Sequence, residues 1–143
     1  PQNLRTILFM TKTALNPPEL FNSRQYGFSQ IVVAEGRRTL YFSGQVAWDE
    51  NQQIAGKDDF AAQTYHAFKN LETAVTLAGA TMSDVVSLRI YIVQEHLAAS
   101  KPVSDNLKQF FPGDSPPAAT WIGVYGLANP DFLIEVEAVV MFD

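Results

Sequence analysis

The segment from Leu133 to Phe142 restricts the fold more than any other part of this chain. Successive side chains of a β-strand point to opposite faces of its sheet, so the two faces of this segment can be read separately. Both faces are largely apolar: one carries Leu133, Val139 and Met141, and the other carries Ile134, Val136, Ala138, Val140 and Phe142. This pattern predicts a strand that is buried from both sides. The fold must therefore cover both faces of the sheet that contains it.

Two predicted helices supply the cover for one face. Asp58 or Asp59 can cap a helix that Gly79 ends, and between them a buried stripe recurs at intervals of three and four residues. The stripe consists of Phe60, Thr64, Ala67, Phe68, Leu71, Ala74, Val75 and Ala78. A second, shorter helix is predicted within Pro102–Phe111, because a proline and a glycine follow it directly.

Four further segments have the β-branched and aromatic composition of strands: Ile31–Ala34, Thr39–Gln45, Val85–Val93 and Thr120–Tyr125. A turn at Glu35–Arg38 predicts that the first two of them pair as a hairpin. The order β-β-α-β-α-β-β, with room for an extra N-terminal strand, predicts an α+β fold in which two helices cover one face of a mixed sheet. The other face then needs a cover from outside the chain, so we predict a homo-oligomer.

The length of 143 residues fits one domain. Met10-Thr11-Lys12 resembles a natural start, so we assign residues 1–11 to an N-terminal extension or leader and residues 12–143 to the single domain.

Composition disfavours several classes of function. The net charge is −5, with ten Lys and Arg against fifteen Asp and Glu, so we expect no nucleic-acid partner. There is no apolar run of about eighteen residues and no cysteine, so we expect no membrane partner and a cytoplasmic location. His66 and His96 lie thirty residues apart, outside any ligand cluster, and the glycines form no phosphate loop. We therefore predict neither a metal nor a cofactor.

Three C-terminal motifs are typical of a known family. Pro117-Ala118-Ala119-Thr120-Trp121, Gly126-Leu127 and Ile134-Glu135-Val136-Glu137-Ala138 resemble the signature of the reactive intermediate deaminases (RidA or YjgF, also called endoribonuclease L-PSP). That signature reads Pro-Ala-Arg-Ser/Thr, a spacer with Leu, then hydrophobic-Glu-hydrophobic-Glu-Ala. Tyr26, Phe42-Ser43-Gly44-Gln45, and Leu77-Ala78-Gly79 with Asp84-Val85-Val86 agree in order and spacing. The resemblance extends from Lys12 to Phe142.

The resemblance implies a chorismate-mutase-like, homotrimeric fold with clefts between subunits. Active members hydrolyse small enamines and imines to ketones and ammonia at these clefts, without a cofactor. By position, Glu135 is the glutamate that handles water, and Tyr26 and Gly44 are cleft contacts. Ser104 stands where the family usually has a cleft asparagine, and Thr120 matches the Ser/Thr of the signature.

The sequence departs from the family at the centre of the site. Ala119 replaces the arginine that holds the substrate carboxylate, and Trp121 replaces a small residue. Both changes disfavour the usual amino-acid-derived imines. Arg89 is a possible surrogate cation, although it can equally pair with a neighbouring acid or extend to solvent. Glu135 can be a proton-transfer group or an interface acid that is hydrogen-bonded across the oligomer. Tyr26 and Trp121 can be ligand contacts or core and interface aromatics.

Three functions remain open, in this order. The first is a divergent imine or enamine deaminase, a hydrolase that acts on a neutral or carboxylate-free small molecule. The second is a trimeric small-molecule-binding protein without catalysis. The third, an endoribonuclease, is the weakest, because the chain is acidic and has neither a metal cluster nor a histidine pair.

Overall fold

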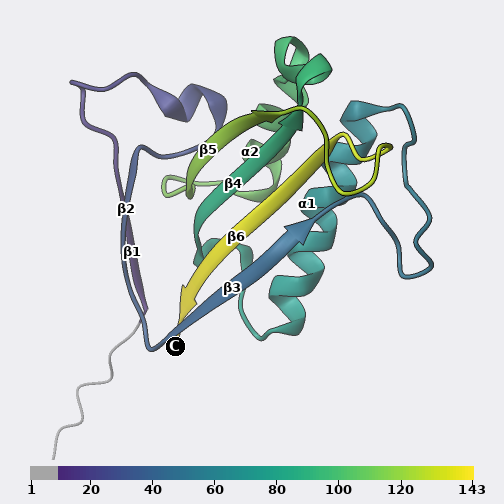
Figure 1. Ribbon diagram of the computed structural model, residues 1–143. Helices are drawn as coiled ribbons and strands as arrows, with labels where there is room; N and C mark the ends of the chain where they lie inside the picture. The colour runs from purple at the N-terminus through teal and green to yellow at the C-terminus, as the bar shows by residue number, and fades with distance from the viewer. Residues whose placement is uncertain (1–9) are drawn as a thin grey trace, which may run out of the picture.

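The computed structural model describes residues 10–143 (Figure 1). Its strands and helices are β1 (Thr11–Leu15), β2 (Ile31–Glu35), β3 (Arg38–Gln45), α1 (Phe60–Leu77), β4 (Val85–Val93), α2 (Lys101–Phe110), β5 (Ala118–Val124) and β6 (Ile134–Phe142). Short 3-10 helices lie at η1 (Ser23–Tyr26), η2 (Met82–Asp84) and η3 (Gln94–Ala99). The fold is α+β with mixed sheets, as predicted, and the extra N-terminal strand is present. The predicted N-terminal extension falls mainly on residues 1–9, which lie outside the described residues.

The main sheet has the strand order β3-β6-β4-β5 (Figure 1). β4 and β5 run parallel, whereas β6 is antiparallel to both of its neighbours. β6 is therefore an inner strand, and Ile134, Val136 and Val140 are fully buried in the core that the sheet shares with α1 and α2. On its opposite face, Val139 and Met141 are half-buried in the single chain. We call this the helix-free face.

α1 forms as the sequence predicts. The side chain of Asp59 accepts a hydrogen bond from the backbone N–H of Ala62 at 3.0 Å, which satisfies one of the free donors of the first turn. Phe68 and Leu71 on the predicted stripe have no solvent exposure. α1 thus packs on the sheet through the predicted stripe of residues that recur at intervals of three and four.

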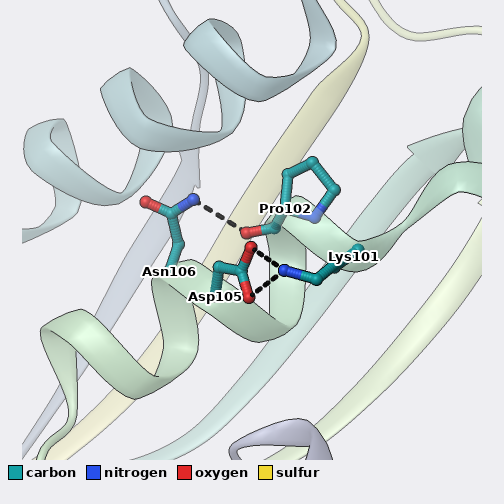
Figure 2. Close-up of polar contacts among 4 residues, drawn as sticks. All are labelled: Lys101, Pro102, Asp105 and Asn106. Carbon is teal, nitrogen blue, oxygen red and sulfur yellow. Dashed lines mark hydrogen bonds and ion pairs between the residues drawn. The ribbon is translucent and has the colours of Figure 1, made fainter.

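Polar contacts within the chain fix the first turns of α2 (Figure 2). The ammonium group of Lys101 contacts both carboxylate oxygens of Asp105, at 2.8 and 3.1 Å. The buried side-chain amide of Asn106 donates to the carbonyl of Pro102 at 2.8 Å. This bond gives the amide a partner inside the helix, where leaving it unpaired would cost free energy.

The predicted hairpin between the second and third strands is wrong. β2 pairs with β1, with Lys12 opposite Ala34 and Ala14 opposite Val32, and β3 pairs instead with β6. The short turn between β2 and β3 indicated local pairing, but distant segments compete for both strands. β6 pairs with β3, and the proline-containing loop of residues 16–30, which holds Pro17 and Pro18, brings β1 alongside β2.

The β1–β2 ribbon lies across one end of the main sheet, from the start of β5 to the start of β3 (Figure 1). Ser29, just before β2, forms a bridge to Ala118 of β5. The ammonium group of Lys12 donates to the carbonyl of Ser83 at 3.2 Å, and Arg38 donates to the carbonyl of Asp143. The ribbon therefore closes the end of the core and leaves the helix-free face open.

None of the helices among residues 10–143 is both long and apolar enough to span a bilayer. Within the same residues, no three acidic or histidine side chains gather in a group that could hold a metal ion.

Candidate functional site

The predicted site residues fall into two groups within one chain. Gly44 and Glu135 lie together on the helix-free face, on β3 and β6. Ala119 and Trp121 lie on β5 in register with Leu88 and Ile90 of β4, so they face the helix layer. Tyr26 and Thr120 join this second group, because all four line one pocket at the outer edge of β5.

Gly44 leaves open the space that the Glu135 side chain occupies. A Cβ atom on residue 44 would lie 2.5 Å from the carboxyl carbon of Glu135, closer than real Cβ atoms approach any neighbour. The pairing of β3 with β6 is irregular between Phe42 and Gln45, which brings the backbone of Gly44 against this side chain. The Ser-Gly-Gln motif therefore makes room for the carboxylate.

Charged and phenolic side chains surround Glu135 on the helix-free face. Tyr91 of β4 lies opposite Glu135 in the register and donates its hydroxyl proton to Glu137, whose neighbour in the register is Arg89. The hydrogen bond to Glu137 is the main cause that raises the pKa of Tyr91 above its ordinary value. Partial burial, and secondarily the negative charge of Glu137, raise the pKa of the Glu135 carboxyl.

This environment predicts the titration of Glu135. We expect a midpoint above the ordinary value of 4.5 in a carboxyl-carbon NMR titration. Glu137→Gln should lower that midpoint without restoring 4.5, since the like charge is lost while burial remains. The pKa of Glu135 is higher in the folded protein than in the unfolded chain, so protonation of Glu135 stabilises the folded state. This stabilisation is present at low pH and is lost as the pH rises through the folded-state pKa. A wild-type midpoint at or below 4.5 would contradict this assignment.

The second group lines a pocket of about 440 Å³ with an aromatic wall. Phe21, Phe28, Trp121 and Tyr26 follow one another in space, with successive ring centroids 6.3, 6.1 and 6.4 Å apart. Successive ring planes meet at 69°, 49° and 75°, so the rings form a bent wall rather than a flat stack. We call this the aromatic pocket.

Hydrogen bonds from Ser23 and Ser29 to backbone carbonyls hold the loop that carries three of these rings. The buried hydroxyl of Ser29 donates to the carbonyl of Pro116 at 2.6 Å, and its N–H donates to the carbonyl of Pro117 at 2.9 Å. The hydroxyl of Ser23 donates to the carbonyl of Phe28 at 2.8 Å. The loop is thus fastened to the start of β5, which sets Phe28 against Trp121.

Gly27 allows η1 to approach α2. Its φ of +96° is in the left-handed region, and a Cβ atom there would lie 2.8 Å from the Cβ of Leu107. Only glycine meets both conditions without strain. The close approach places Tyr26, the residue before it, at the pocket.

The interior of the aromatic pocket has no fixed charge. None of the described residues that line it, Ala119 among them, is charged. The indole Nε1 of Trp121 is buried and has no hydrogen-bond acceptor within residues 10–143. An unpaired buried donor costs free energy.

Ser104 joins neither group, and Arg89 lies next to Glu137 on the helix-free face rather than at the aromatic pocket. Ser104 is buried on α2 and lines neither the aromatic pocket nor the surroundings of Glu135. Arg89 is exposed on the helix-free face, where it lines a smaller pocket of about 260 Å³ with Tyr41 and Glu137. The sequence analysis missed Phe21, Phe28 and Gln30 of the aromatic pocket. The cluster of aromatic residues in the loop before β2 is the signal that could have found them.

The comparisons with known proteins identify the family and the fold of the chain. The family profile described as Endoribonuclease L-PSP matches residues 23–142. The solved structure of YyfB, a Rid-family protein of unknown function from Yersinia pestis, is 38% identical with a TM-score of 0.87 and covers 92% of this chain and 98% of its own. A YjgF/YER057c/UK114-family member from Mycobacterium tuberculosis is 28% identical with a TM-score of 0.61, covering 92% of this chain and 99% of its own.

RidA from the Antarctic bacterium Psychrobacter shares the fold, with 22% identity, a TM-score of 0.62, and coverage of 76% of this chain and 84% of its own. The motifs that meet at Gly44 and Glu135, the strand order and the profile match all point to one family. The chain belongs to the Endoribonuclease L-PSP family, the group that includes the Rid and YjgF proteins.

Proposed function

We propose that this protein is a cofactor-independent hydrolase of imines or enamines that acts as a homotrimer, at clefts between its subunits. The observation that carries the proposal is the division of the site residues within one chain. Glu135 and Gly44 lie on the helix-free face, whereas Tyr26, Ala119 and Trp121 lie at the edge of β5 on the helix side. A cleft that uses both groups needs two copies of the chain. Tyr41, 81% exposed on β3, is well placed to be covered by such a copy.

The reaction assigns one role to each group. Glu135 takes a proton from a water molecule as its oxygen attacks the carbon of the C=N bond, and returns this proton to the nitrogen to give a carbinolamine. The carboxylate then moves the hydroxyl proton to the nitrogen as well, so that the C–N bond breaks, ammonia leaves and the C=O bond of the ketone forms. The balance is one imine and one water in, one ketone and one ammonia out. A raised pKa supports this role, because the carboxyl exchanges protons more readily near neutral pH. The aromatic pocket binds the substrate and holds its C=N group next to this carboxylate. The absence of cysteine fits a reducing compartment, so we place the reaction in the cytoplasm.

The substrate of this protein lacks a carboxylate. A carboxylate in a site without a cation would lose its hydration and gain no charged partner. None of the described residues of the aromatic pocket can provide the bidentate pair that an arginine would form.

Comparing the wild type with Ala119→Arg tests the proposal. We expect the wild type to release ammonia from carboxylate-free imines. The variant should gain turnover on freshly generated aminoacrylate, by about 10–100-fold over the wild type, from a hydrogen-bonded charge pair. Ammonia release is followed with a coupled assay. If the variant gains nothing and the wild type turns over no member of the imine series, the hydrolase proposal is wrong.

A non-catalytic binding protein is the second candidate, favoured by the aromatic pocket of about 440 Å³. This function predicts ligand-induced thermal stabilisation and a change in tryptophan fluorescence, without any product.

A further inference from the structure

We propose that the aromatic pocket binds the cationic nitrogen end of its ligand, an alkylated ammonium or iminium group. The inference rests on the proposed function for treating this pocket as the substrate's site. It goes further by naming which end of the ligand the pocket recognises, and by which force.

The first argument is the arrangement of the rings. Phe21, Phe28, Trp121 and Tyr26 border one pocket, and each ring plane is turned by 49° to 75° from the next. A bent wall of this kind presents several ring faces and edges to one ligand group. The negative face of an aromatic ring attracts a cation that lies within about 6 Å of its centre, and Trp attracts it most strongly.

The second argument is charge. An anion finds no cation in the pocket, because Ala119 stands in the arginine position and none of the described lining residues is charged. The chain as a whole carries a net charge of −5, which raises the local concentration of cations rather than anions. The pocket is thus electrostatically opposite to one that holds a carboxylate.

The third argument concerns the kind of cation. No carboxylate lines the described pocket, so a small, strongly hydrated metal ion would find no replacement for its water shell. An alkylated nitrogen is weakly hydrated and carries its own apolar surface. Phe21 and Tyr26 are 62% and 44% exposed in the single chain, and such a ligand would cover both. The hydroxyl of Tyr26 can accept a hydrogen bond from an iminium N–H.

This recognition suits the proposed reaction. A protonated imine is a cation and reacts with one water to give a neutral ketone and an ammonium ion, which keeps any alkyl group of the imine nitrogen. A pocket that prefers the cation holds the electrophilic, protonated form of the substrate in place and releases the ketone. In the family, an arginine binds the substrate through its carboxylate. Here the aromatic rings bind the substrate through its cationic nitrogen instead.

The test compares choline with its neutral carbon isostere, in which a tert-butyl group replaces the trimethylammonium group. The two have nearly the same shape, so their affinities differ through charge. We expect calorimetry on the full-length protein to show choline binding about tenfold tighter than the isostere. In a Trp48→Phe background, choline should also change the fluorescence of Trp121. The isostere binding as tightly as choline, or neither compound binding, would overturn the inference.

Two variants locate the binding. Tyr26→Leu and Phe28→Leu each remove one ring and keep an apolar side chain, and each should weaken choline binding severalfold. Tyr26 is partly exposed, so its variant folds even if the other does not. Tyr125→Leu is the matched control, because that ring is 96% exposed and outside the pocket. Choline affinity unchanged in both pocket variants would also overturn the inference.

The results separate this inference from the hydrolase proposal. Choline binding at the pocket without turnover of any imine would sustain the inference and remove the hydrolase. Turnover of imines without a preference for choline over its isostere would sustain the hydrolase proposal and overturn the inference.

Discussion

Glu135→Gln is expected to lower imine turnover by about 10²–10⁴-fold, the usual contribution of a positioned general base. Glutamine has nearly the same shape and fits the space that Gly44 leaves, but it cannot take a proton from water. The measurement is the rate of ammonia release under saturating substrate, with light scattering and circular dichroism to show that assembly and fold are unchanged.

Glu137→Gln is the matched control for this substitution. It removes a carboxylate from the same face of β6, two residues away, where Tyr91 donates its hydroxyl proton to it. We expect it to shift the acid limb of the pH–rate profile to lower pH and to leave most of the turnover intact. Equal losses in the two variants would mean that Glu135 acts through the charge of the whole face rather than as the base.

Phe68→Ala is expected to lower the free energy of unfolding by about 3–5 kcal/mol, the range for removing a buried aromatic side chain. Phe68 has no solvent exposure, and its ring centroid lies 5.7 Å from that of Phe110 and 6.3 Å from that of Phe111. The variant therefore leaves a cavity where α1 meets α2. Urea unfolding measures the loss. Leu77→Ala, at an 83% exposed position of the same helix, should change the free energy by no more than about 0.5 kcal/mol. Similar losses at the two positions would contradict the assigned core.

Local periodicity was enough to predict the elements that carry the core. The stripe of α1 and the alternation of β4 and β6 depend on which side chains each element buries, so they are visible along the sequence. The pairing of β2 was not predictable in this way. Its partner β1 is separated from it by the proline-containing loop, so the pairing is not marked by a short turn. The short turn between β2 and β3 favours a hairpin instead, but β6 occupies the edge of β3 that such a hairpin would use.

The site was only partly predictable for a related reason. Gly44 and Glu135 belong to motifs, and the structure brings them into contact. The aromatic pocket depends on a loop that is held by Ser29 against the start of β5, a long-range contact that no motif marks. Phe21 and Phe28 were therefore missed. Motif matching also could not reveal that Trp121 faces the helix layer while Glu135 faces away from it.

The most direct test of the central claim uses two inactive variants in one assembly. Glu135→Gln lacks the base, and Trp121→Ala lacks the aromatic pocket. Each should be inactive when expressed alone. If every cleft takes Glu135 from one subunit and the pocket from the next, each trimer that contains both variants has one complete cleft out of three, so purified mixed trimers regain about one third of the wild-type activity. Co-expression, followed by purification of the mixed trimers and an ammonia-release assay, measures this fraction. Mixed trimers as inactive as their parents would contradict the shared cleft.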